Sequence, residues 1–160
     1  MGSWRGDSDV GRLIQMGDLD ELVEAAREAF TRVHRTVFVG EPAANPRLPV
    51  DVLGAAMVVD TPTLVLLTPW TLNGLFILPD QSTPEVLTVA GRARPVFAAD
   101  LEPLGPYLSV NLVSDVSAWH SPEQGRLIAR SFVAPFRAAV QQLRSGSPAA
   151  EPSAPPSAQP

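Results

Sequence analysis

The chain has 160 residues and a net charge of −5, and this length favours one compact domain that buries a core of its own. Because cysteine is absent, disulfides, thiolate metal sites and cysteine nucleophiles are excluded. The two histidines disfavour a histidine-rich metal site, and the acidic balance argues against nucleic acid as a partner, since that would need a basic patch.

The N-terminal part predicts a flexible segment followed by one long helix. Residues 1–17 are rich in glycine and serine and lack the apolar run of a signal peptide. Asp18 is a suitable helix cap, apolar residues then recur at helical spacing, and Gly40 and Pro42 are expected to stop the helix. His34 falls on neither the apolar nor the acidic stripe, so we expect it to be solvated.

The outer face of this helix begins acidic and ends basic, an order that complements the helix dipole. Its early part carries Glu21, Glu24 and Glu28. The simpler interpretation is a solvated helix face. The alternative is an acidic rim for a basic peptide.

The middle of the chain predicts a run of strands. Residues 61–79 carry no charge and form two apolar runs, which is typical of a strand covered on both faces or of a central strand beneath helices. Prolines and the Asn73-Gly74 pair interrupt this stretch, so a membrane-spanning helix is rejected. Gly54 weakens the preceding strand or marks a bulge. The predicted strands are 50–59, 63–68, 72–78, 86–90, 95–99 and 107–113.

The C-terminal part predicts a second helical region and a tail. Ser121 is expected to cap a helix with a proline in its first turn, and Pro135 should kink or split it. Residues 145–160 are rich in serine, alanine and proline and are predicted to be disordered. The domain at 18–144 is therefore predicted as α+β, a two-layer sandwich whose N-terminal and C-terminal helices are laid against one face of an antiparallel sheet.

No pattern in the chain demands catalysis. A phosphate loop, a nucleophile elbow and a metal-binding helix motif are all absent from the sequence. Asp100, Glu102 and Asp115 could pair as acid and base, but nothing in their spacing requires it. Trp70 and Asn73 are open to two interpretations. They are either a core aromatic and a turn residue next to a positive-φ Gly74, or both line a groove that binds a peptide.

Several short motifs, taken together, resemble the HybE/HupJ family of NiFe-hydrogenase assembly chaperones. These motifs are Asn45-Pro46-x-Leu48-x-Val50, Gly54, Leu67-Thr68-Pro69-Trp70-x-Leu72-Asn73, Leu78-Pro79 and Leu104-Gly105-x-Tyr107. Where the family tends to show Ser-Leu-x-Ser-Pro-Met, this chain has Asn111-Leu-Val-Ser-Asp-Val116. The role of residues 114–121 therefore stays open.

The resemblance implies a cytoplasmic, non-enzymatic chaperone without a cofactor. Its partners would be the precursor of the hydrogenase small subunit, whose twin-arginine signal peptide it would hold, and other maturation factors, with no nucleic acid and no membrane insertion. The residues expected to bind this partner are Asn45, Pro46, Thr68, Pro69, Trp70, Asn73 and Leu75. Two alternatives remain, a small-molecule-binding or catalytic domain around Trp70 and a structural subunit of the hydrogenase. The sequence leaves the client hydrogenase and the oligomeric state open.

Overall fold

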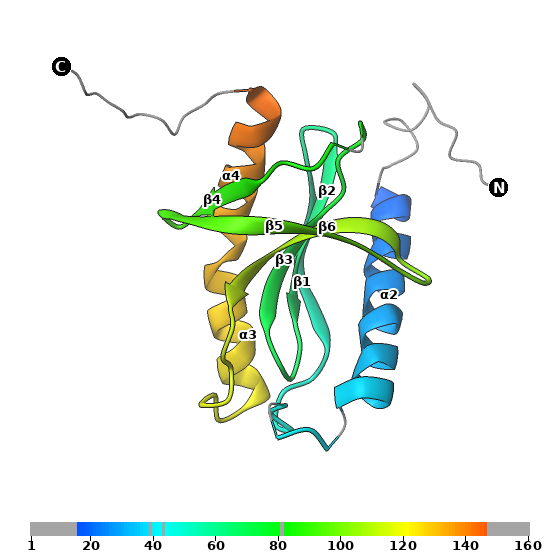
Figure 1. Cartoon of the computed structure of the whole chain (residues 1–160), viewed down its shortest axis with the longest axis vertical. Coiled ribbons are helices and arrows are strands. Elements are labelled where there is room, and N and C mark those ends of the chain that lie inside the picture. The colour runs from blue at the N-terminus through cyan, green and yellow to red at the C-terminus, as the bar shows by residue number, and fades with distance from the viewer. Residues whose placement is uncertain (1–15, 39, 43, 81, 147–160) are drawn as a thin grey trace.

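The structure is a computed structural model that describes residues 16–38, 40–42, 44–80 and 82–146 (Figure 1). The predicted flexible N-terminus lies outside the described residues except for its last two positions, and the predicted disordered tail lies outside except for its first two. The N-terminal helix α2 spans Met16–Val33, so it begins two residues before the predicted cap, and Asp18 lies inside its first turn.

The centre of the molecule is one curled sheet of six antiparallel strands in the order β1-β2-β3-β6-β5-β4 (Figure 1). The strands β2 and β3 form the predicted central hairpin, because the uncharged stretch of the sequence can be buried on both faces. The strands are β1 (Asp51–Val58), β2 (Thr61–Leu67), β3 (Leu72–Phe76), β4 (Val86–Val89), β5 (Arg92–Leu101) and β6 (Gly105–Val113).

The two faces of the sheet are covered by different helices. Leu64 and Leu66 of β2 belong to a small buried cluster with α2. The alternating Val65 and Leu67 belong to a larger cluster with the C-terminal helices α3 (Pro122–Ser131) and α4 (Val133–Ser145). The α+β class and the antiparallel sheet are confirmed. The layering differs from the prediction, since the helices lie on opposite faces and make three layers (Figure 1).

Two predicted irregularities are confirmed. The β1–β2 register shifts between Leu53 and Ala56, and Gly54 has φ +61, a conformation that favours glycine. A Cβ on Gly54 would also lie 2.6 Å from the Val133 side chain, so the glycine allows α4 to approach the sheet. The C-terminal helical region breaks between α3 and α4 at Phe132, three residues before Pro135.

The predicted turn at Asn73-Gly74 is wrong. Both residues lie inside β3, where Gly74 is buried and pairs with Val65 on one side and Val110 on the other. A Cβ on Gly74 would lie 2.6 Å from the ring of Phe136 on α4. The glycine is therefore needed for helix–sheet packing and not for a positive φ.

The edge strand β1 is held between both helical layers. The Asp51 carboxylate lies 2.8 Å from Arg126 of α3 and 3.6 Å from Arg27 of α2. At the other end of the strand, Asp60 accepts from Arg144 of α4 at 2.8 Å. These contacts close one edge of the sheet with side chains from the flanking helices.

Candidate functional site

The β2–β3 corner, where the most specific motif lies, is held by the Thr68 hydroxyl group. Thr68 Oγ1 donates to the Thr71 carbonyl at 2.9 Å and accepts from the Trp70 and Thr71 amides at 3.2 and 2.9 Å. Thr68 and Pro69 are buried. Threonine side chains often organise turns in this way. The corner is a rigid platform that leaves Trp70 half-buried at its tip.

Asn45 joins three loops at this end of the sheet. Its backbone amide donates to the Pro69 carbonyl at 2.7 Å, and its side-chain Nδ2 donates to the carbonyls of Val116 and Trp119, both at 2.9 Å. Its Oδ1 accepts from the Arg47 amide at 3.0 Å. Asn45 is only 3% exposed. Its side chain therefore anchors residues 114–121 against the β2–β3 corner and reaches no solvent-facing surface.

Trp70 stacks against His34, which the sequence analysis expected to be solvated. The two ring centroids are 6.0 Å apart with an interplanar angle of 15°. His34 opens a single π-helical turn, His34–Phe38, which follows α2 and turns its side chains relative to the preceding helix. His34 is half-buried, and its Nδ1 has no partner among the described residues. The prediction that His34 is solvated is wrong, because this turn brings its imidazole onto the indole of Trp70.

Asn73 lies on the α2 side of β3 and bonds across the sheet. Its Oδ1 accepts from Asn111 Nδ2 of β6 at 3.0 Å, and the two residues are register partners. Both side chains are half-buried. The amide pair leaves the Asn73 Nδ2 donor and the Asn111 Oδ1 acceptor without a hydrogen bond to another described residue. A pair of this kind can bond a peptide backbone without breaking its own contact.

A buried arginine fixes the bulge that positions Asn111. The β3–β6 register shifts between Leu72 and Asn73, and the Arg94 guanidinium donates to the carbonyls of Asn111 and Leu112 at 3.2 and 2.7 Å. Arg94 is 8% exposed, donates further to the Val89 carbonyl, and lies 5.7 Å from the Phe132 ring centroid. Burial, together with the charge of Arg92, lowers the pKa of Arg94 below its ordinary value.

The α2 side of the sheet is only partly covered. Helix α2 packs most closely on β1 and reaches β6 at Tyr107, whose ring meets Phe30 edge-on at 5.9 Å. Burial there raises the pKa of the Tyr107 phenol, which favours the neutral form. Farther along the sheet, five half-buried or exposed side chains share this face, and we call them the open strip. They are Trp70, Asn73, Asn111, Ser109 and Phe97.

The remaining predicted site residues divide by burial. Pro46 is exposed beside Asn45, whereas Leu75 is buried beneath α2 at 3% exposure. Pro46, Trp70 and Asn73 are thus the predicted residues that a partner can reach. Asn45, Thr68, Pro69 and Leu75 lie below them as support.

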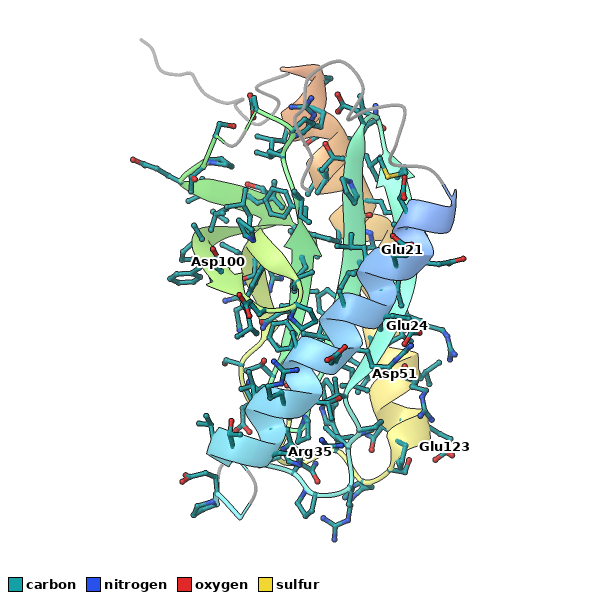
Figure 2. The ribbon with its side chains drawn as sticks, turned by 90° about the vertical axis from the view of Figure 1, so that its right-hand side faces the viewer. Glu21, Glu24, Arg35, Asp51, Asp100 and Glu123 are labelled. Atoms are coloured by element: carbon teal, nitrogen blue, oxygen red, sulfur yellow. The ribbon has the colours of Figure 1, made fainter. Side chains whose placement is uncertain are left out.

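Most of the expected acidic rim is paired within its own helix. Glu24 bonds Arg27 at 2.6 Å and Glu28 bonds Arg32 at 3.0 Å. Figure 2 shows Glu21 and Glu24 on the side of α2 that faces away from Asp100. Glu21 is exposed and forms no ion pair with another described residue. Pairing leaves Glu21 as the rim carboxylate with the freest charge.

Neither of two depressions on the described surface provides a small-molecule pocket at Trp70. One is a polar hollow along the charged face of α2, between Glu24 and Arg35. The other is apolar, lies between Leu22 and Tyr107, and has a volume of about 10 Å³, room for a single water at most. The residues described contain no cluster of His, Asp or Glu suited to a metal ion. Their helices also lack the length and apolar character needed to cross a membrane.

Four residues of this region were not predicted. Asn111, Ser109 and Phe97 fall within predicted strands without a predicted role, and Arg94 falls outside them. Alternation along β6 could place Asn111 and Ser109 on one face. The pairing of Asn73 with Asn111 depends on strand order and register, which a single sequence does not specify.

Comparison with known proteins agrees with the motifs. The family model described as "[NiFe]-hydrogenase assembly, chaperone, HybE" matches residues 21–159. The solution structure of HybE from Escherichia coli is similar in fold, with a TM-score of 0.52 and 22% sequence identity over 71% of this chain and 77% of that chain. In a search of curated protein sequences, nothing matched. The predicted resemblance is confirmed, and the chain belongs to the HybE family of NiFe-hydrogenase assembly chaperones.

Proposed function

We propose that this chain is a non-enzymatic cytoplasmic chaperone that holds the precursor of a NiFe-hydrogenase small subunit by its twin-arginine signal peptide. The observation that carries the proposal is the open strip. It combines exposed aromatic area with side-chain amides that have hydrogen-bonding groups to spare. It lies beside the β2–β3 corner, which is built from the family motif and held by Thr68. Such a surface suits an extended peptide better than a small metabolite.

Each reachable residue has a role in this proposal. Trp70 and Phe97 offer flat apolar area at the two ends of the strip, and Phe97 is 56% exposed. Between them, Asn73 and Asn111 offer one donor and one acceptor to a peptide backbone. Pro46 extends the surface at the Trp70 end, and the buried Asn45, Thr68, Pro69 and Leu75 hold it in shape.

Charge favours a basic partner. The chain carries 17 acidic and 12 basic residues, and Glu21 stands unpaired among the described charges of the first turns of α2. Arginine binds carboxylates through charge-assisted hydrogen bonds, often two at once. An arginine pair that precedes an apolar run would therefore find both of its requirements on this side of the sheet.

Calorimetric titration with a synthetic signal peptide of the small-subunit precursor tests the proposal. We expect saturable binding that weakens about fivefold in Asn73→Ala, since one backbone hydrogen bond to a peptide contributes roughly 1 kcal/mol. A peptide with both arginines replaced by glutamine should bind more weakly, and the loss should shrink at high salt. Thr88→Ala, an exposed change on β4, is the control and should bind normally. If no binding heat is detected with any of these peptides, the proposal is refuted.

A further inference from the structure

One part of the β5 edge has no partner strand among the described residues. Strand β5 runs over Arg92–Leu101, but β4 pairs only with its first four residues. The last contact on that side is the Val96 amide, which donates to the Glu85 carbonyl at 3.0 Å. Beyond it, residues 97–101 pair with β6 alone. The opposite edge, β1, is by contrast held between α2 and α3 through Asp51.

The register shows which backbone groups face the open side. In an antiparallel strand, successive residues direct their N–H and C=O groups to alternate sides. Because the Val96 amide points toward β4, the amides of Ala98 and Asp100 point the same way. Pro106, the residue of β6 opposite Asp100, has no N–H to offer, which agrees with this assignment. Ala98 and Asp100 thus present two donors and two acceptors without a described partner.

The side chains around this edge are small, apolar or acidic. Ala98 and Ala99 are exposed and leave room for an incoming backbone, while Phe97 projects on the face of the open strip. Asp100 and Glu102 are exposed, and the sequence contains no lysine or arginine from residue 95 to residue 125. No ion pair of the described residues involves either carboxylate.

The acidic end of this edge lies close to the first turns of α2. Leu104, in the turn after Glu102, and Tyr107 line one apolar depression together with Leu22. Glu21 is the neighbour of Leu22, but Figure 2 shows Glu21 and Asp100 on opposite sides of α2. Asp100 and Glu102 are therefore the carboxylates of the β5 edge, and Glu21 of α2 is separate from them.

We propose that the free edge of β5 takes up the signal segment of the precursor as an additional strand. The segment's backbone would bond Ala98 and Asp100, an apolar side chain would rest on Phe97, and arginine would bind Asp100 and Glu102. This proposal rests on the proposed function and adds a second contact: one part of the peptide crosses the open strip at Asn73 and Asn111, and the part beyond Phe97 pairs with β5. Pairing with a second copy of this chain is disfavoured, because it would bring the same acidic groups together.

Amide hydrogen exchange of the full-length chain, measured by NMR with the wild-type signal peptide, tests the placement. We expect the amides of Ala98 and Asp100 to gain protection of about tenfold or more on saturation, since each enters a new ladder. The amides of Phe97 and Ala99 face β6 already and should change little. If the peptide binds and saturates the chain but the amides of Ala98 and Asp100 gain no protection, this placement is overturned and the proposed function stays intact.

Two proline variants give the matched test by titration. Ala98→Pro removes an outward amide and should weaken peptide binding about tenfold, because proline cannot donate to an added strand. Thr88→Pro removes an outward amide on the exposed edge of β4, outside the proposed site, and should leave binding unchanged. If Ala98→Pro fails to fold by circular dichroism, a peptide N-methylated at alternate residues replaces it, and undiminished binding of both methylated registers would overturn the proposal.

The remaining outcomes separate the alternatives. Absence of wild-type binding refutes the proposed function and this inference together. If the free chain dimerises, and Ala98→Pro abolishes the dimer without changing peptide affinity, the edge belongs to a second copy of the chain. That result would overturn this inference and leave the proposed function intact. Asp100→Asn combined with Glu102→Gln should reduce affinity about two- to fivefold, with an effect that salt removes. An unchanged affinity there would exclude these carboxylates as the arginine site.

Discussion

The two faces of the sheet are built from the same strands but are covered by helices to different extents. On the α3/α4 side, residues of five strands enter one large apolar cluster, and Val96 of the sixth strand, β5, packs against it. The buried Arg94 has its donors on carbonyl oxygens. On the α2 side, a smaller cluster covers β2 and part of β3, and β6 and β5 then show Ser109, Asn111 and Phe97 to solvent. One face stabilises the fold, and the other leaves polar and aromatic side chains uncovered.

The comparison explains why one central hairpin carries both core residues and residues that we propose to bind the partner. In β3, Leu72, Gly74 and Phe76 face the closed side, while Asn73 faces the open side. A strand alternates its side chains between faces, so a motif of consecutive residues necessarily serves both. Substitutions within one motif should therefore separate cleanly into those that unfold the protein and those that do not.

The largest contrast is expected between two phenylalanines. Phe136→Ala should lower the free energy of unfolding by about 3–5 kcal/mol, because a fully buried ring between Gly74 and Phe76 is lost. Phe97→Ala on the open side should change it by less than about 0.5 kcal/mol. Urea denaturation of both variants checks this. Equal losses would contradict the assignment of closed and open faces.

Loss of the buried guanidinium should come next. Arg94→Met keeps an unbranched side chain but leaves the carbonyls of Asn111 and Leu112 without their donor, so we expect a loss of about 1–3 kcal/mol. Arg94→Lys should not restore stability, since one ammonium cannot reproduce the planar fork. Recovery of wild-type stability by lysine in urea denaturation would argue against the bulge-fixing role.

The two asparagines of the family motifs should then differ. Asn45→Ala removes both donors to the loop at residues 114–121 and should cost about 1–3 kcal/mol, because its amide is buried. Asn73→Ala should cost less than about 1 kcal/mol, since water can reach the half-buried Asn111 amide that loses its partner. Thermal unfolding of both variants measures this order, and a reversed order would place Asn73 among the structural residues.

The smallest effect is expected from pH in the loop that Asn45 anchors. Asp115 accepts from the Ser117 hydroxyl at 2.6 Å and from the Ser117 amide at 3.0 Å, and these bonds lower the pKa of Asp115 below its ordinary 3.8. A carboxyl group whose pKa is lower in the folded state stabilises the fold at pH values above its unfolded pKa. This contribution to stability is lost as the pH falls through the folded pKa. Asp80 makes the same pair of bonds with Ser82 in the segment between β3 and β4 and serves as the internal comparison.

Carboxyl NMR titration of the two aspartates measures this effect. Both should titrate below pH 3.8, and Ser117→Ala should raise the pKa of Asp115 and leave that of Asp80 unchanged. A shift of Asp80 in that variant, or none of Asp115, would contradict a local origin for the lowered pKa.

Sequence patterns predicted the features that depend on local chemistry. The apolar runs of β2 and β3, the Gly54 bulge, the Ser121 cap and the break before Pro135 all follow from composition and spacing. The role of Gly74 was mistaken, because the Asn-Gly pair is a common turn signal and only the approach of Phe136 shows otherwise. The His34–Trp70 stack and the Asn73–Asn111 pair join distant segments, so they depend on tertiary packing that no local pattern encodes.

The most direct test of the whole account is a chemical-shift map of the full-length chain titrated with the precursor's signal peptide. We predict that the perturbed residues gather on the open strip and the β5 edge, with Asn73, Asn111, Phe97 and Ala98 among them. The residues of α3 and α4 should stay unperturbed. Perturbations confined to α3 and α4, with the open strip unchanged, would contradict the claim that the α2 side of the sheet is the recognition face.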